Sequence, residues 1–407
     1  MDARRLLDTL AAFARCTDTP GRGVTRFSWS GADRRARELL MEACAALGLD
    51  IRVDGIGNIR ARMAGRGPGP AVLLGSHLDS VRHGGRLDGI YGVCAALEVL
   101  RTFREEGHVP GCAVELVAFA EEEGSNFGST CLGSKAVTGL CDGAALRELT
   151  DGRENAWERL RAFGLSPECL PGQQIRPEEA RAWLEVHIEQ NRVLEQAGAR
   201  LGVVSAICGM RLHRLRFTGV SDHAASPMPG RRDPLAAFAR FAAGMEDLWR
   251  TGALPRDYAC TVGSISCSPD VGIVIPGSVT FTVDVRHVDT EALEAGWVRI
   301  EALAREVTRE YGVLMSVERL SASGGAQMDR GIMALFREGA ARHGAPWLDM
   351  TSGPAHDAAC MARVTAAGLL FVPSIGGRSH CPEEDTAPAD LALGAQVLED
   401  TTRRLAG

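Results

Sequence analysis

Four short apolar segments of this chain are each followed by side chains that can bind a metal ion or move a proton. No other feature of the sequence constrains the fold as strongly. The segments and the residues that follow them are 71–76 with His77, 112–120 with Glu121 to Glu123, 183–186 with His187, and 369–372 with His380. Such runs are typical of buried strands, and open α/β sheets place their chemistry at the carboxyl ends of strands. The pattern predicts an α/β fold with a reaction site at one edge of a sheet.

Residues around these segments suggest distinct roles. His77 can bind a metal ion through one ring nitrogen while Asp79 accepts a hydrogen bond from the other, which fixes the tautomer of a ligand histidine. Asp88 lies just before an amphipathic helical pattern, and a carboxylate on such a loop can bridge two cations. Adjacent glutamates after a buried strand repel one another and lose hydration, so a metal ion or a shared proton is the simplest way to keep them there. We expect one of them to be a ligand and another a general base.

Taken singly, each of these blocks has an ordinary explanation. A lone histidine is more often a core or surface residue than a ligand, and a run of glutamates is usually a solvated face. The blocks occur together, each after an apolar segment, and jointly they match the residues that a two-metal hydrolase needs. The set therefore favours an enzyme.

Length and composition agree with this interpretation. A chain of 407 residues favours two domains, and 45% hydrophobic with 24% charged residues is typical of a globular protein. The net charge of −7 and the lack of a basic block argue against a nucleic-acid partner. The N-terminal residues lack the apolar core of a signal peptide, and no apolar run approaches membrane-spanning length. The twelve cysteines are scattered and form no CxxC pair, so we expect reduced thiols in a cytoplasmic protein without a membrane partner.

The stretch from 209 to 321 has a character of its own. Its alternating and amphipathic segments predict the order β-α-β-β-α-β, the ferredoxin-like plan, over residues 211–219, 234–248, 259–268, 279–286, 291–310 and 314–319. Because His380 lies beyond it, this stretch interrupts the metal-binding region. We expect a catalytic domain of residues 1–208 and 322–407, and an inserted domain of 209–321 on two linkers that could act as a hinge.

The insert carries candidate functional residues too. His223 lies in a loop of small and polar residues, and Arg286 ends an alternating strand. Arg286 could hold a carboxylate in bidentate geometry. An ordinary surface salt bridge with Asp284 or Asp233 is an equal alternative on this evidence.

Together these motifs resemble the hydantoinase/carbamoylase branch of the aminoacylase-like metallopeptidase superfamily, over nearly the whole chain. That branch contains allantoate amidohydrolase, β-ureidopropionase and N-carbamoyl-L-amino-acid hydrolase. The motifs are Gly75-Ser76-His77-Leu78-Asp79-Ser80, Gly84-Gly85-Arg86-Leu87-Asp88-Gly89-Ile90-Tyr91-Gly92-Val93, Glu122-Glu123-Gly124-Ser125, His187-Ile188-Glu189-Gln190, Ser352-Gly353 with His356-Asp357-Ala358, and Ser379-His380 with Pro382 and Glu384. The resemblance implies a catalytic domain like that of dinuclear zinc peptidases, a mixed sheet flanked by helices, with an inserted ferredoxin-like lid and dimerisation domain.

The resemblance also implies a metal site with two divalent ions, zinc in the first place, with manganese, cobalt or nickel as alternatives. Asp88 would bridge the ions, His77 and His187 would complete the protein ligands of one, and Glu123 and His380 those of the other. Glu122 would be the general base and acid. It would deprotonate a water between the ions, and the resulting hydroxide would attack the linear amide bond of a small carboxylate-bearing ureido compound.

Further positions match substrate contacts of the family. His223 would stabilise the tetrahedral oxyanion, reaching from the lid of a partner subunit in a homodimer. Gln190, His356 and Arg286 would hold the substrate, with Arg286 on its carboxylate. The two domains would close over the substrate as a hinge.

One departure from the family bears on the substrate. Ile273 stands where family members usually carry an asparagine, so a polar contact is lost and the acid side of the pocket should be less polar than in an allantoate enzyme. Two alternatives to the ureido hydrolase stay open. One is an aminoacylase, a dipeptidase or another amide hydrolase with an altered pocket, and the other is an inactive binding protein on the same scaffold.

Overall fold

The computed structural model describes residues 1–407, which divide into two compact units. Unit 1 comprises Met1–Ile207, Gln327–Ser352 and His356–Gly407. Unit 2 comprises Cys208–Ala326 with Gly353–Ala355, where the sequence suggested an insert of 209–321. No helix combines the length and the apolar character that crossing a membrane requires.

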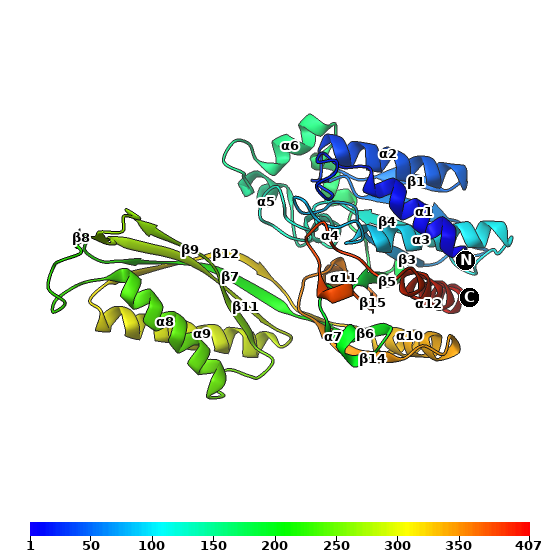
Figure 1. Ribbon diagram of the computed structural model, residues 1–407. Coiled ribbons are helices and arrows are strands. Elements are labelled where there is room, and N and C mark those ends of the chain that lie inside the picture. Colours follow the sequence, from blue (N-terminus) through cyan, green and yellow to red (C-terminus); the bar gives the residue numbers. More distant parts are fainter. The chain divides into compact units, whose positions relative to one another are not determined.

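Unit 1 is built on a mixed sheet of nine strands (Figure 1). The order is β1-β2-β4-β3-β5-β15-β6-β13, and β14 pairs with β6. The bounds are β1 Asp50–Val53, β2 Ile59–Met63, β3 Ala71–His77, β4 Val114–Phe119, β5 Ala180–Ile188, β6 Leu201–Ile207, β13 Ala326–Gln327, β14 Trp347–Ser352 and β15 Ala366–Val372. Strands β4, β3, β5 and β15 are parallel neighbours, so their carboxyl ends share one edge.

Helices flank this sheet. They are α1 Ala3–Ala14, α2 Gly31–Ala46, α3 Ile90–Glu105, α4 Leu132–Val137, α5 Gly143–Glu148, α6 Ala156–Phe163, α7 Val193–Ala197, α10 Arg330–Arg342, α11 Asp357–Met361 and α12 Pro388–Ala406, with short 3-10 helices η1 Pro167–Gly172 and η2 Ile375–Gly377. Helices α3 and α12 pack against the central strands, and α1 packs on both, so the first and last helices of the chain are neighbours (Figure 1). Every residue of β3 and β4 is buried, which agrees with the continuous apolar runs of the sequence.

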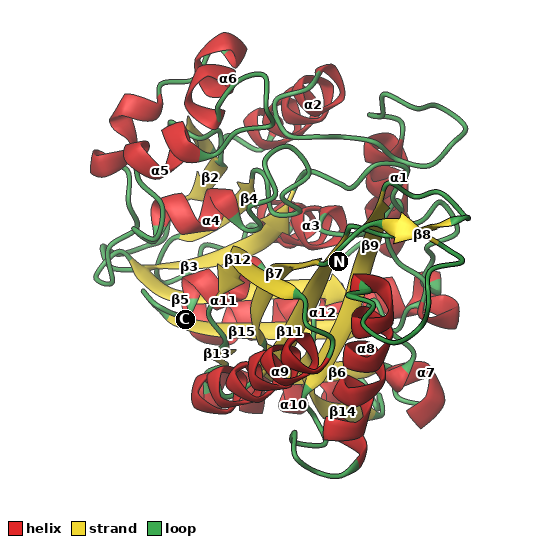
Figure 2. Cartoon of the chain, turned by 90° about the vertical axis from the view of Figure 1, so that its left-hand side faces the viewer, coloured by secondary structure: helices red, strands yellow, loops and turns green.

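Unit 2 contains a four-stranded antiparallel sheet in the order β12-β7-β11-β9. Its elements are β7 Gly209–Thr218, β8 Asp222–His223, α8 Pro234–Arg250, β9 Ala259–Ser268, β10 Val274–Ile275, β11 Ser278–His287, α9 Thr290–Glu310 and β12 Leu314–Ser323. Helices α8 and α9 pack against each other and against this sheet (Figures 1 and 2). Setting aside the short β8–β10 pair, this is the ferredoxin-like arrangement.

The core of unit 2 lies between the sheet and its two helices. Along β11, Val279, Phe281, Val283 and Val285 are buried, whereas alternate residues are half-buried. The ring of Phe281 lies 5.0 Å from Phe217 and 4.9 Å from Phe238, measured between centroids. Every second residue of β11 therefore lines the covered face of the sheet, and Phe281 is at the centre of that face.

We predict that Phe281→Ala destabilises unit 2 by about 3–5 kcal/mol, because it leaves a cavity among aromatic side chains. Thr280→Ala, on the other face of the same strand, should cost less than about 1 kcal/mol. Denaturant unfolding followed by tryptophan fluorescence would measure the difference, since Trp249 and Trp297 of unit 2 contribute to the signal beside the four tryptophans of unit 1. Equal losses in the two variants would contradict the assignment of the core to this face.

Candidate metal centre

The structure brings the predicted ligands together at the shared carboxyl edge of β4, β3, β5 and β15. His77 is the last residue of β3, and Glu122 and Glu123 follow β4. His187 lies near the end of β5, and His380 lies on the loop after β15. Parallel strands have therefore carried residues that are far apart in the sequence to one place, as the four apolar segments indicated.

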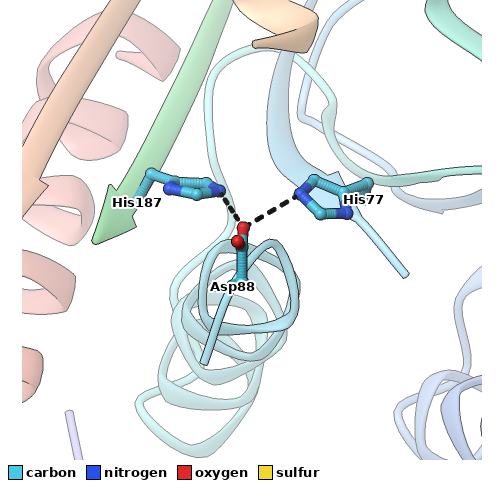
Figure 3. Close-up of side chains that lie close together, drawn as sticks. All are labelled: His77, Asp88 and His187. Atoms are coloured by element: carbon cyan, nitrogen blue, oxygen red, sulfur yellow. Dashed lines mark ion pairs between the residues drawn. The ribbon is translucent and has the colours of Figure 1, made fainter. Parts of the chain in front are cut away.

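Asp88 lies at the centre of this group (Figure 3). Its Oδ1 is 3.4 Å from His77 Nε2 and 3.1 Å from His187 Nε2. Its Oδ2 is 3.1 Å from His380 Nε2, which in turn is 3.4 Å from Glu123 Oε2. The two oxygens of the Asp88 carboxylate thus face two different sets of candidate metal ligands.

Backbone carbonyls orient both buried histidines. His77 Nδ1 lies 3.1 Å from the carbonyl oxygen of Asp79, and His187 Nδ1 lies 2.9 Å from that of Ile188. An Nδ1–H that donates to a carbonyl leaves Nε2 free to bind a metal ion, and in both residues Nε2 faces Asp88.

Asp79 lies beside His77 Nδ1, where the sequence analysis placed it. The closer atom is its carbonyl oxygen, and the carboxylate lies 3.7 Å away. The reason is that the Asp79 carboxylate accepts hydrogen bonds from the backbone N–H groups of Glu122, at 3.1 Å, and Glu123, at 3.2 Å. The Asp79 carboxylate therefore holds the glutamate segment, while its carbonyl orients the histidine.

Gly89 explains how Asp88 approaches the histidines so closely. Its φ is +65°, and a Cβ built on it would lie 2.3 Å from the His77 ring. A larger residue would be strained and would collide with a predicted ligand. The pair Asp88-Gly89 is therefore a requirement of the site's geometry.

Electrostatics favour a cation at this edge. Burial raises the pKa of Glu122, and burial together with the neighbouring Asp88 raises the pKa of Glu123 well above its usual value. Burial opposes ionisation of Asp88 too, but hydrogen bonds from His187, His380 and His77 hold its pKa well below the usual value. Buried carboxylates in contact are costly unless cations or protons compensate them.

The donor set fits divalent metal ions. In two overlapping groups, His77, Asp88 and His187, and Asp88, Glu123 and His380, the candidate ligand atoms lie within 4.8 Å of one another. Two ligands bonded to one zinc at about 2.1 Å in tetrahedral geometry lie about 3.4 Å apart, close to the distances around Asp88. Glu123 Oε1 is buried without a hydrogen-bond partner, as a ligand oxygen in want of a cation would be. Imidazole and carboxylate ligands suit zinc, and also manganese, cobalt and nickel.

The residues expected to touch substrate fall in both units. In unit 1, Gln190 Nε2 donates to Asp88 Oδ2 at 2.8 Å, and the buried His356 ring lies 4.6 Å from that of His187. His356 Nε2 and Gln190 Oε1 have no hydrogen-bond partner. Both residues therefore lie beside the candidate metal ligands, and each has one polar atom without a hydrogen-bond partner.

Unit 2 holds the other three. Arg286 forms two hydrogen bonds with Asp284, at 2.9 and 3.1 Å, and donates a third to the carbonyl of Gly353. The salt bridge that the sequence left as an alternative therefore exists. His223 is exposed on β8, and Ile273, 67% exposed, accepts a hydrogen bond from the neighbouring Ala224.

Glu384 plays a part that the sequence reasoning did not assign. Its Oε1 accepts hydrogen bonds from the N–H groups of Leu87, at 2.9 Å, and Asp88, at 3.0 Å, and its Oε2 accepts one from Ser379. It therefore fixes the loop that carries Asp88. The only sequence signal was its place in the last family motif, four residues after His380.

Comparison with known proteins gives the class of this chain. Residues 73–404 match the model of peptidase family M20/M25/M40. The chain is 37% identical over 381 residues to N-carbamoyl-L-amino-acid amidohydrolase of Paenarthrobacter aurescens, over 93% of this chain and 92% of that protein. It is 34% identical over 387 residues to allantoate amidohydrolase of Bacillus subtilis, over 94% and 93%. A hydantoinase/carbamoylase family amidase from Burkholderia multivorans has a similar structure, with a TM-score of 0.89 at 32% identity, over 100% and 98%.

Fold, donor groups and relatives together define an amidohydrolase, an enzyme that cleaves carbon–nitrogen bonds in linear amides other than peptides. The chain belongs to peptidase family M20/M25/M40, and the resemblance to its hydantoinase/carbamoylase branch is confirmed.

We predict that Glu384→Gln lowers metal affinity about 10- to 100-fold, because a glutamine side chain cannot accept all three hydrogen bonds that fix the Asp88 loop. Glu383→Gln is the matched control, since Glu383 is exposed and pairs only with Arg378. Competition with a chromophoric chelator would measure both affinities. Unchanged affinity in Glu384→Gln would show that this loop does not depend on Glu384.

Proposed function

We propose that this enzyme hydrolyses the carbamoyl carbon–nitrogen bond of a small N-carbamoyl acid. The observation that carries the proposal is the Asp88 carboxylate, whose two oxygens face separate groups of candidate ligands, while Glu122 Oε2 lies 3.9 Å from His77 Nε2. A site with one carboxylate common to two ligand sets and a second carboxylate outside them has the parts needed for amide hydrolysis.

In this proposal His77, Asp88 and His187 would hold one divalent ion, and Asp88, Glu123 and His380 would hold the other. When bound, such ions supply Lewis acidity to the substrate carbonyl and to the attacking water. Zinc fits the imidazole and carboxylate set. The protein's own part is to hold these side chains in fixed orientations, with His77, Asp88 and His187 buried and His380 open to solvent.

Glu122 moves the proton. Its Oε2 lies 3.9 Å from His77 Nε2, and Glu122 belongs to neither candidate ligand group. Glu122 can therefore take a proton from the attacking water and pass it to the leaving nitrogen. Burial raises the pKa of this carboxyl group, which favours its function as a proton acceptor.

The substrate class follows from the relatives and from unit 2. The relatives act on N-carbamoyl-L-amino acids and on allantoate, which are both carboxylates with a ureido group. We assign the substrate carboxylate to Arg286, whose planar guanidinium is already oriented by Asp284. Ile273 offers an apolar side chain, and this favours an N-carbamoyl amino acid with an apolar side chain over the more polar allantoate.

The remaining expectations concern assembly and location. We propose that the chain acts as a homodimer in which His223 of unit 2 stabilises the oxyanion in the partner's site. The twelve cysteines are all unpaired, which supports a reducing, cytoplasmic environment.

The test is ammonia release by the zinc-loaded enzyme from allantoate, N-carbamoyl-β-alanine, and N-carbamoyl-L-amino acids with polar or apolar side chains, with N-acetyl amino acids and dipeptides assayed by amino acid release. We expect the highest kcat/KM for an apolar N-carbamoyl-L-amino acid. Glu122→Gln should lower kcat at least about 100-fold because the general base is lost. Its metal content should be unchanged, since Glu122 is no ligand.

Two results would contradict this proposal in different ways. Equal turnover of allantoate and apolar N-carbamoyl amino acids would remove the role given to Ile273. Hydrolysis of N-acetyl amino acids or dipeptides alone would replace the ureido hydrolase by an aminoacylase or dipeptidase.

A further inference from the structure

The Glu122 side chain is held by a buried thiol. Cys131 Sγ donates a hydrogen bond to Glu122 Oε1 at 3.1 Å, and the Cys131 N–H donates to the Glu122 carbonyl at 2.7 Å. The thiol supplies the only hydrogen bond that the Glu122 carboxylate accepts. Cys131 has a left-handed backbone, with φ of 55°, immediately before α4. An uncommon conformation for a residue with a Cβ thus occurs where side chain and backbone both contact Glu122.

We propose that Cys131 is a positioning residue that directs the free oxygen of Glu122 toward the reacting water. The inference rests on the proposed function, in which Glu122 transfers the proton. Cys131 lies outside the candidate ligand set, and it affects the reaction only through its contact with Glu122.

The contact distinguishes the two oxygens of Glu122. The thiol occupies Oε1, whereas Oε2 lies 3.9 Å from His77 Nε2, on the side of the ligands. Asp79 Oδ1 accepts a hydrogen bond from the Glu122 N–H at 3.1 Å, so the backbone is fixed as well. A general base must lie within hydrogen-bond reach of the proton it takes, and a displacement of about 1 Å can cost about 100-fold in rate.

A neutral thiol is suited to this task. An arginine or lysine in its place would make a charge-assisted bond about twice as strong and would stabilise the ionised carboxylate, which weakens it as a base. The S–H group is a weak donor that orients the carboxylate without adding charge. The adjoining Cys360 thiol, burial and the charge of Glu122 raise the pKa of Cys131 well above its usual value, so the thiol keeps its proton.

The thiol is itself anchored through α11. Cys360 is buried on that helix, next to Cys131. Ser134 on α4 donates to Asp357 Oδ1 at 2.5 Å, at the start of α11, and ties the two helices together. Because Cys131 lies just before α4, this bond fixes the relation between the two cysteines.

The experiment compares Cys131→Ala and Cys131→Ser in the zinc-loaded, full-length enzyme with the best substrate of the panel. We expect Cys131→Ala to lower kcat about 10- to 100-fold, with KM and metal content unchanged. Cys131→Ser should stay within about threefold of the wild type, because a hydroxyl on the same Cβ can donate to the same oxygen. Cys94→Ala is the matched control, since it removes an equally buried thiol on α3 far from Glu122 in the sequence and without a contact to it.

The inference is overturned if Cys131→Ala and Cys131→Ser lose equal activity. It is also overturned if both variants lose only thermodynamic stability and no activity, which the comparison with Cys94→Ala would show. The S–H stretching band in the infrared difference spectrum of wild type and Cys131→Ala gives a readout that needs no turnover. We expect a hydrogen-bonded S–H band that shifts in Glu122→Ala, and a band at the free-thiol frequency would overturn the inference. A hydrogen-bonded band in a chain that hydrolyses nothing would support the contact and count against the proposed function.

Discussion

The contact between one carboxylate and three histidines is the interaction on which the site depends. Asp88 Oδ1 faces His77 and His187, and Asp88 Oδ2 faces His380, so the two donor groups share only this residue. The histidines come from β3, from β5 and from the loop after β15. Neighbouring parallel strands are what bring them to one edge, and a helix that starts directly after Asp88-Gly89 lets the carboxylate reach them. The sheet therefore serves as a rigid frame for the candidate metal ligands.

Two further carboxylates, those of Asp79 and Glu384, hold the segments that carry the candidate ligands, and both do so in the same way. Asp79 accepts hydrogen bonds from two consecutive N–H groups in the segment of Glu122 and Glu123. Glu384 does so for the segment that ends in Asp88. Each buried carboxylate thereby satisfies backbone donors that would otherwise be unpaired, and each fixes a loop whose side chains must keep their orientation. Burying these two carboxylates costs electrostatic free energy. Their hydrogen bonds are what keep the ligand segments in position.

The sequence predicted what local patterns determine. Apolar runs predicted the strands β3 and β5, and the residues after them are the candidate ligands, because a strand and the residue at its end are set by neighbouring sequence. The choice between the carbonyl and the carboxylate of Asp79 could not be predicted, since it depends on backbone donors more than forty residues away. The contact of Cys131 with Glu122 depends likewise on a left-handed backbone before α4, and a scattered cysteine gives no periodic signal. For Arg286 the salt bridge with Asp284, one of the two sequence alternatives, is present, and the contact with a substrate carboxylate stays a prediction.

The central claim is that Asp88 joins two metal sites in one centre. Anomalous diffraction from crystals of the zinc-loaded enzyme, collected on both sides of the zinc absorption edge, would locate the bound ions directly. We expect two peaks on either side of the Asp88 carboxylate, one beside His77 and His187 and the other beside Glu123 and His380. A single peak, or two peaks without Asp88 between them, would contradict it.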